Sequence, residues 1–133
     1  MILIDTSFIV GLISASDQLH RQCLIASASI TEEVITTWPC ITEAMYLLKH
    51  PHAKEILRVQ IEAGIWSVYA PQAQDLMRAC DLMRLYADTP MDFADASLVA
   101  LAETLNIRRI LTWDRHFYVY LIHNEIPFEM LLR

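Results

Sequence analysis

Short apolar runs recur along the chain, and longer stretches with helical spacing of apolar residues separate them. The run at residues 2–4 is uniformly apolar and ends at Asp5, as expected of a strand buried on both faces of a parallel sheet. Four later runs, rich in β-branched or aromatic residues, also predict strands. They lie at residues 34–38, 65–69, 108–112 and 128–132, the last expected at a sheet edge.

The intervening stretches predict helices at residues 6–14, 19–30, 40–49, 53–63, 76–87 and 93–105, with a short helix at 113–117. A capping box over residues 14–17 is expected before the second helix. The fifth helix is expected to bury one face, made up of Leu76, Ala79, Cys80, Met83 and Ala87. Alternating strands and helices predict one domain over residues 1–133, a three-layer α/β/α sandwich with a mainly parallel sheet of four to five strands.

Apolar residues make up 55% of the 133 residues, which is high for a soluble domain. The excess indicates an apolar surface covered by a partner or a second copy. The longest charge-free runs, at residues 6–16 and 63–74, have 11 and 12 residues, so no membrane segment is expected, and the apolar start lacks the basic region of a secretory signal. Cys23, Cys40 and Cys80 form no CxxC pair and are expected to be reduced core thiols in a cytoplasmic protein.

The net charge of −6, from 10 bases and 16 acids, argues against a generic basic nucleic-acid binder. Five of the acids, however, lie where predicted strands end or predicted helices begin, namely Asp5, Glu43, Asp92, Asp95 and Asp114. Without these five, the chain has 11 acids and 10 bases. A site that gathered them around a metal ion would leave the remaining surface nearly neutral and would not repel phosphate.

The five acids are expected at one edge of the sheet. Asp5 ends the first strand, Glu43 lies in the helix after the second, and Asp114 follows the fourth. Asp92 and Asp95 open the helix that leads into the fourth strand, on one helix face. Parallel strands share a carboxyl edge, and ligands bind there in open α/β sheets.

Each acid also has a local interpretation, as a helix cap or a partner of a helix dipole. The expected convergence of the acids favours a metal site over these local roles, because four or five neighbouring carboxylates repel one another unless they take up protons or bind a cation. An oxygen-only donor set favours Mg²⁺ or Mn²⁺, as one or two ions, and suits phosphodiester hydrolysis. Thr6, Ser7 and Thr112 supply hydroxyls nearby, and Arg115 a cation for substrate phosphates, although each also fits a local surface or capping role.

The ordered motifs resemble a PIN domain, most closely the VapC-type toxins of bacterial toxin–antitoxin pairs. The motifs are Ile2-Leu-Ile-Asp5-Thr6-Ser7, Ile41-Thr-Glu43, Asp92-Phe-Ala-Asp95-Ala96 and Leu111-Thr-Trp-Asp114-Arg-His-Phe117. The resemblance implies a metal-dependent endoribonuclease whose acids are Asp5, Glu43, Asp95 and Asp114. Asp92 would assist or replace Asp95. The family further implies an RNA substrate, a homodimer and a small antitoxin that puts a basic side chain into the acidic pocket.

Other functions remain open at this point. A free-standing PIN nuclease in RNA processing would need no antitoxin, and a PIN-like interaction module would keep the fold without catalysis. Two other α/β phosphoryl-transfer classes fit less well. A haloacid-dehalogenase-type phosphatase would need Asp where Ser7 stands, and a receiver domain would need Asp where Ala70-Pro71 ends the third strand.

Overall fold

A five-stranded parallel sheet forms the centre of the molecule. The computed structural model, which describes residues 1–132, places the strands in the order β3–β2–β1–β4–β7. Every neighbouring pair is parallel, which confirms the predicted sheet and its edge strand. The strands are β1 (Ile2–Ile4), β2 (Val34–Thr36), β3 (Trp66–Val68), β4 (Arg109–Leu111) and β7 (Glu129–Met130).

The central strand is β1, and its three residues are fully buried. Leu3 aligns with Ile35 of β2 on one side and Ile110 of β4 on the other. Helices cover both faces of the strand, which explains why its sequence is uniformly apolar instead of alternating. The strand ends at Ile4, so the next residue, Asp5, lies at the middle of the sheet's carboxyl edge.

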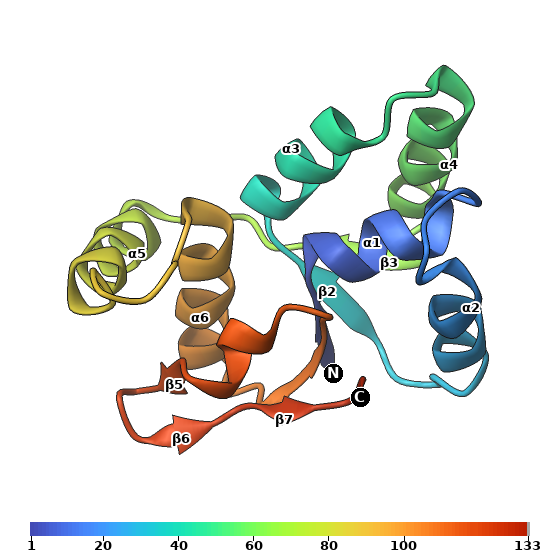
Figure 1. Cartoon of the computed structure of the whole chain (residues 1–133). Helices are drawn as coiled ribbons and strands as arrows, with labels where there is room; N and C mark the ends of the chain where they lie inside the picture. Colours follow the sequence, from blue (N-terminus) through green and yellow to red (C-terminus); the bar gives the residue numbers. More distant parts are fainter. Residues whose placement is uncertain (133) are drawn as a thin grey trace.

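Helices lie on both faces of the sheet, so the predicted three-layer sandwich is confirmed (Figure 1). On one face α5 packs on α6, and on the other α1 contacts α2 and α4. Helix α3 contacts both α1 and α6 and so bridges the two layers at the carboxyl edge. No helix within residues 1–132 is both long and apolar enough to cross a membrane. The helices are α1 (Thr6–Ile13), α2 (His20–Ala28), α3 (Trp38–Leu47), α4 (Pro51–Glu62), α5 (Ala73–Leu85) and α6 (Phe93–Leu105).

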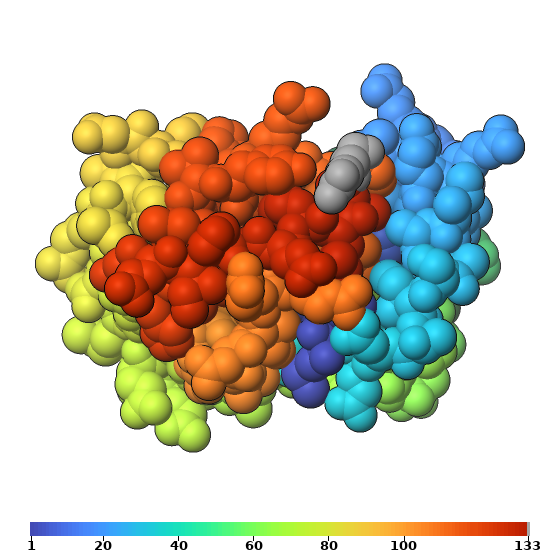
Figure 2. Space-filling view, turned by 90° about the horizontal axis from the view of Figure 1, so that it is seen from below, coloured from blue at the N-terminus to red at the C-terminus, as the bar shows by residue number. Residues whose placement is uncertain are grey.

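The C-terminal segment contains a hairpin that the apolar pattern does not predict. After the 3₁₀ helix η1 (Arg115–Tyr118), strands β5 (Leu121–Ile122) and β6 (Ile126–Pro127) pair antiparallel. His123 and Asn124 make the turn with positive φ angles of 54° and 60°. Figure 2 shows this segment, in orange and red, running across the underside of the molecule between the yellow-green α5 and the blue α2.

Two local predictions were wrong. Helix α2 starts at His20 with Leu19 as N-cap, so residues 14–17 form no capping box on it. In α5 the buried residues are Ala79 and Leu82, whereas Leu76 and Cys80 of the predicted core face are exposed. Cys23 and Cys40 are buried free thiols as expected. Burial raises the pKa of Cys40 to about 12, so this thiol stays protonated and unreactive at neutral pH.

The contact between α1 and α2 at Gly11 is closely packed and gives a first prediction. A Cβ atom at Gly11 would lie 2.6 Å from Sγ of Cys23, and that sulfur also accepts a hydrogen bond from Nε1 of Trp113 at 3.1 Å. Gly11→Ala is therefore expected to lower the free energy of unfolding by about 1–3 kcal/mol through overpacking. In a Cys23→Ala background the same substitution should cost clearly less. Urea unfolding of the four proteins measures this coupling; equal costs in both backgrounds would contradict it.

Candidate active site

The topology brings all five predicted acids to the carboxyl edge of the sheet. Asp5 directly follows β1 and serves as N-cap of α1. Asp114 follows β4 and caps η1, while Glu43 lies in α3, the helix that leaves β2. Asp92 and Asp95 stand at the start of α6, whose C-terminal end leads into β4, so its N-terminus lies beside the carboxyl end of that strand. Several of these acids thus cap helices and also gather at one place.

Asp5 lies deepest, with 4% of its surface exposed. Its Oδ1 accepts the backbone N–H of Thr6 at 2.7 Å. Its Oδ2 accepts the hydroxyls of Thr112 at 2.6 Å and Ser7 at 3.1 Å. Burial raises the pKa of Asp5, and these three hydrogen bonds oppose the rise, while the charge of Asp114 adds to it.

The predicted hydroxyls of Ser7 and Thr112 form a small network that joins β1 to β4. Their oxygens lie 3.3 Å apart. Oγ of Ser7 accepts the N–H of Trp113 at 2.9 Å, and Oγ1 of Thr112 accepts the N–H of Asp114, also at 2.9 Å. The two hydroxyls therefore fix the turn that carries Asp114 relative to the carboxylate of Asp5. Thr6 contributes its backbone to Asp5, whereas its hydroxyl donates to the carbonyl of Cys40 at 3.4 Å.

Asp92 and Asp95 form a reciprocal capping box. The Asp92 carboxylate accepts the Asp95 N–H at 2.8 Å, and the Asp95 carboxylate accepts the Asp92 N–H at 3.1 Å. Partial burial and the neighbouring charge of Asp92 raise the pKa of Asp95 to about 8, with further contributions from Asp5 and Asp114. The capping box therefore fixes Asp95 at the start of α6, close to the negative charges of Asp92, Asp5 and Asp114.

Glu43 belongs to the same electrostatic cluster. It is half-buried in α3, and burial is the main cause that raises its pKa. The carboxylates of Asp92 and Asp5 raise it further, while the Thr6 hydroxyl lowers it. Glu43 and Asp92 also line one open groove, so these two acids face solvent on the α3 side of the site.

His116 is a site residue that sequence reasoning missed. Asp114 Oδ1 accepts the His116 backbone N–H at 2.9 Å and lies 2.7 Å from His116 Nδ1. The imidazole stacks on the ring of Tyr120, with centroids 6.4 Å apart. The sequence signal was only a histidine two residues after an acid, and the contact depends on the 3₁₀ turn. Arg115 is exposed and lines a separate hollow beside Thr112 and Trp113.

The donor chemistry of this cluster fits a hard divalent cation. Its donors are carboxylate and hydroxyl oxygens. Burial first, and then the charges of neighbouring carboxylates, raise the pKa values of Asp5, Glu43 and Asp95, and a bound cation would offset both causes. Within residues 1–132, no three His, Cys, Asp or Glu side chains stand close enough together to hold one ion. A bound ion would therefore have to draw the carboxylates together by side-chain rotation.

Comparison with known proteins gives a consistent result. The family model described as PIN domain matches residues 2–120. No curated protein matches the chain. Among solved structures, VapC20 of Mycobacterium tuberculosis, described as a sarcin-ricin loop cleaving toxin, superposes with a TM-score of 0.86. The two sequences are 22% identical, and the match covers 96% of this chain and 100% of that one.

Two further structures have the same fold. A toxin–antitoxin complex from Klebsiella pneumoniae is 18% identical over 86% of this chain and 87% of its own, with a TM-score of 0.67. VapBC-1 from nontypeable Haemophilus influenzae is 12% identical over 98% of each chain, with a TM-score of 0.61. At these identities the similarity shows the fold, and the chemistry has to be argued from the residues of this chain.

Proposed function

The chain belongs to the PIN domain family, and from this premise we propose that it is a Mg²⁺- or Mn²⁺-dependent endoribonuclease. The observation that supports the proposal most strongly is the group of five carboxylates at the carboxyl edge of the sheet, with the pKa of Asp95 at about 8. Neighbouring carboxylates repel one another when they are ionised, and this repulsion destabilises the folded protein unless a bound cation offsets it. A catalytic metal site explains why the fold keeps them.

Asp5, Glu43, Asp95 and Asp114 are the residues that would hold the metal, with Asp92 assisting at the start of α6. One or two divalent ions in this place would neutralise charge on the scissile phosphate and lower the pKa of a water molecule. Two ions would engage the attacking and leaving oxygens together.

The remaining residues orient these acids. Ser7 and Thr112 donate hydrogen bonds to Asp5 and fix its rotamer, as metal ligands commonly require. His116 contacts Oδ1 of Asp114 with its backbone N–H and its Nδ1. Arg115 is exposed near Thr112 and is available to a phosphate of the RNA.

We assign the protein to the toxin side of a toxin–antitoxin pair that acts in the cytoplasm on RNA. Two of the similar structures are described as a toxin–antitoxin complex and as VapBC-1, and these descriptions are the reason to expect a small antitoxin here. The expected basic side chain of such a partner suits a pocket of repelling carboxylates. The antitoxin would then mask the site by replacing the metal's positive charge.

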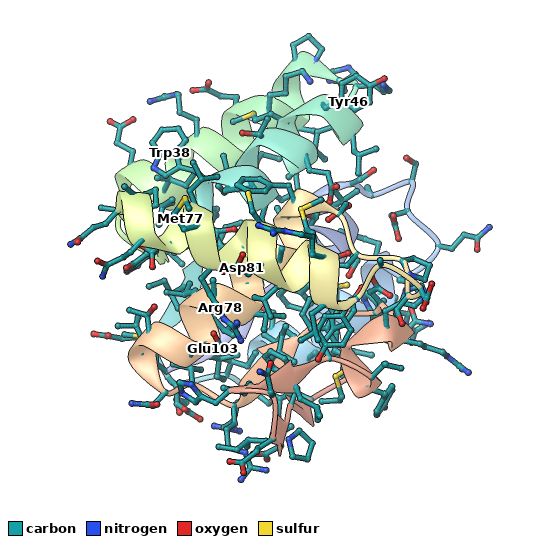
Figure 3. The ribbon with its side chains drawn as sticks, turned by 90° about the vertical axis from the view of Figure 1, so that its left-hand side faces the viewer. Trp38, Tyr46, Met77, Arg78, Asp81 and Glu103 are labelled. Carbon is teal, nitrogen blue, oxygen red and sulfur yellow. The ribbon has the colours of Figure 1, made fainter. Side chains whose placement is uncertain are left out.

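The homodimer is assigned to the outer face of α3 and α5 (Figure 3). Trp38 and Met77 are 59% and 63% exposed there. Beside them lies an apolar hollow of about 270 Å³, whose lining includes Leu76, Phe93 and Leu101. Exposed apolar side chains around an unfilled hollow are typical of a surface that a second protein chain covers.

Metal dependence is the test of the proposed reaction. Purified protein is expected to cleave a structured RNA in Mn²⁺, to lose cleavage completely in excess EDTA and to regain it when Mn²⁺ is restored. Gel analysis of end-labelled RNA measures this, and protein repurified through a second column excludes a contaminating nuclease. Equal cleavage in EDTA would contradict the mechanism. Isothermal titration of Mn²⁺ into the protein gives an independent readout when no suitable RNA is at hand.

A further inference from the structure

An open groove continues from the candidate active site along the outer side of α3. Its volume is about 610 Å³. Its lining includes Glu43 and Asp92, two of the site acids, so the groove and the acidic cluster share a wall. The rest of the lining is Trp38, Pro39, Thr42, Tyr46, Phe93 and Ala94. A polymer bound at the carboxylates would have to leave the site along a path of this kind.

Three aromatic side chains of this groove are exposed. Tyr46 is 73% exposed. Trp38 and Phe93 are also exposed in this chain, but both line the apolar hollow assigned to the second copy as well. Positions 38, 42 and 46 lie on one face of α3, so Trp38 and Tyr46 stand two turns apart, as Figure 3 shows. Tyr46 follows Glu43 by three residues and does not line the apolar hollow assigned to the second copy. Its ring is thus an aromatic surface adjacent to a catalytic acid.

A cation lies over one face of the Tyr46 ring. Nζ of Lys49 is 4.3 Å from the centroid of that ring, which leaves the opposite face for a base. Within residues 1–132, Lys49 forms no salt bridge with an acid. Its charge is therefore available to a ligand, in contrast to Arg58, Arg78, Arg84 and Arg109, which are paired with acids.

We propose that Tyr46 and Lys49 bind the nucleotide next to the cleaved bond, with its base stacked on the Tyr46 ring and its phosphate against the Lys49 ammonium. The inference rests on the proposed ribonuclease function. Stacking on an exposed ring beside a cation is how proteins hold unpaired nucleotides without reading their sequence. Tyr46 and Lys49 thereby become positioning residues that set where along the RNA the metal site acts.

A nucleotide fits this groove better than a second copy of the chain does. The groove is lined by aromatic side chains and two carboxylates, and Lys49 lies over the ring of one of these aromatic residues, whereas the hollow between α3, α5 and α6 is lined mainly by apolar residues. Protein interfaces exclude charged residues from their centres. A nucleotide presents a flat base and an anionic phosphate, which match the ring and the ammonium. The carboxylates of Glu43 and Asp92 then face the metal that the cleaved phosphate requires.

A cycle between protein and RNA variants tests the stacking. Binding of a labelled hexaribonucleotide is measured by fluorescence anisotropy with Mg²⁺, in an Asp5→Asn background that prevents cleavage. Tyr46→Ala is expected to raise Kd about tenfold, and Tyr46→Phe to leave it within about twofold. One abasic position in the hexamer should cost a similar factor, and that cost should disappear in Tyr46→Ala. Lys49→Ala should weaken binding and reduce its salt dependence.

Ile25→Ala is the matched control, because this side chain is 64% exposed on α2 and lines neither this groove nor the hollow that contains Arg115. An unchanged Kd in Tyr46→Ala, or an equal loss in Ile25→Ala, would overturn the proposal. So would a Tyr46→Ala protein that sediments as a monomer where the parent is a dimer, because the ring would then belong to the subunit interface. A wild-type protein that binds RNA through Tyr46 but cleaves nothing would remove the ribonuclease proposal alone. If the wild type cleaves RNA and Tyr46→Ala cleaves it at the same rate, the role proposed for Tyr46 is wrong while the ribonuclease proposal stands.

Discussion

Asp5→Asn is expected to lower the rate of RNA cleavage by at least about a thousandfold while the protein stays folded. Asp5 is the most deeply placed acid of the site and the one that the hydroxyls of Ser7 and Thr112 orient. An amide of the same shape removes the charge that a metal ion requires. The fold should tolerate the change, because burial disfavours the Asp5 charge and both hydroxyls can also accept a hydrogen bond from the amide.

Single-turnover cleavage in Mn²⁺ measures the loss, and thermal unfolding in EDTA confirms the fold. Asp81→Asn is the matched control, since this exposed aspartate of α5, labelled in Figure 3, forms a salt bridge with Arg84 and no other within residues 1–132. Its cleavage rate should equal that of the wild type, because exposed ion pairs contribute little. Full activity of Asp5→Asn with metal present would refute the proposed site. A loss of activity accompanied by unfolding would be tested again with Asp114→Asn.

The strands were predictable because their apolar runs are short, uniform and bounded by turn residues. The run at 2–4 is a strand with those bounds, and its uniform composition indicated burial on both faces. The helix at 93–105 was also predicted with its observed bounds, because a capping pair precedes it and an unbroken apolar stretch follows. From these elements alone the parallel sheet follows, and with it the common edge that gathers the acids.

The failures have physical causes. Helix α5 carries apolar residues on two adjacent stripes, and periodicity alone does not say which stripe the protein buries. The structure buries Ala79 and Leu82 and leaves Leu76 and Cys80 outside. The C-terminal hairpin was missed because its strands have two residues each and its turn needs left-handed backbone at His123 and Asn124.

The same limit applies within the site. Convergence of the acids follows from topology, but the partner of each acid depends on strand order and turn geometry. Thr112 reaches Asp5 only because β4 lies next to β1, which no local pattern encodes. His116 reaches Asp114 only through the 3₁₀ turn of η1. A sequence therefore predicts which carboxylates meet more readily than it predicts the side chains that orient them.

Asp95→Asn is expected to stabilise the metal-free protein at alkaline pH. The pKa of Asp95 is about 8 in the folded protein and 3.8 as its ordinary value. Between these values the folded state keeps a proton that the unfolded state has released, so unfolding releases protons and stability falls as pH rises. The contribution is complete below pH 3.8 and is lost as pH rises through about 8. Asparagine carries no such proton, and its side-chain oxygen can still accept the Asp92 N–H.

In EDTA, the melting temperature of the wild type should therefore fall more steeply between pH 6 and pH 9 than that of Asp95→Asn, with a gap of about 3 °C or more at pH 9. Differential scanning calorimetry measures both slopes, and Asp81→Asn should reproduce the wild-type slope. Millimolar Mn²⁺ should raise the wild-type melting temperature most at pH 9, where the cation replaces the missing proton, and should raise that of Asp95→Asn less. Identical slopes in wild type and Asp95→Asn would mean that the repulsion lies elsewhere in the cluster. Asp95 would then have no special part in holding the metal.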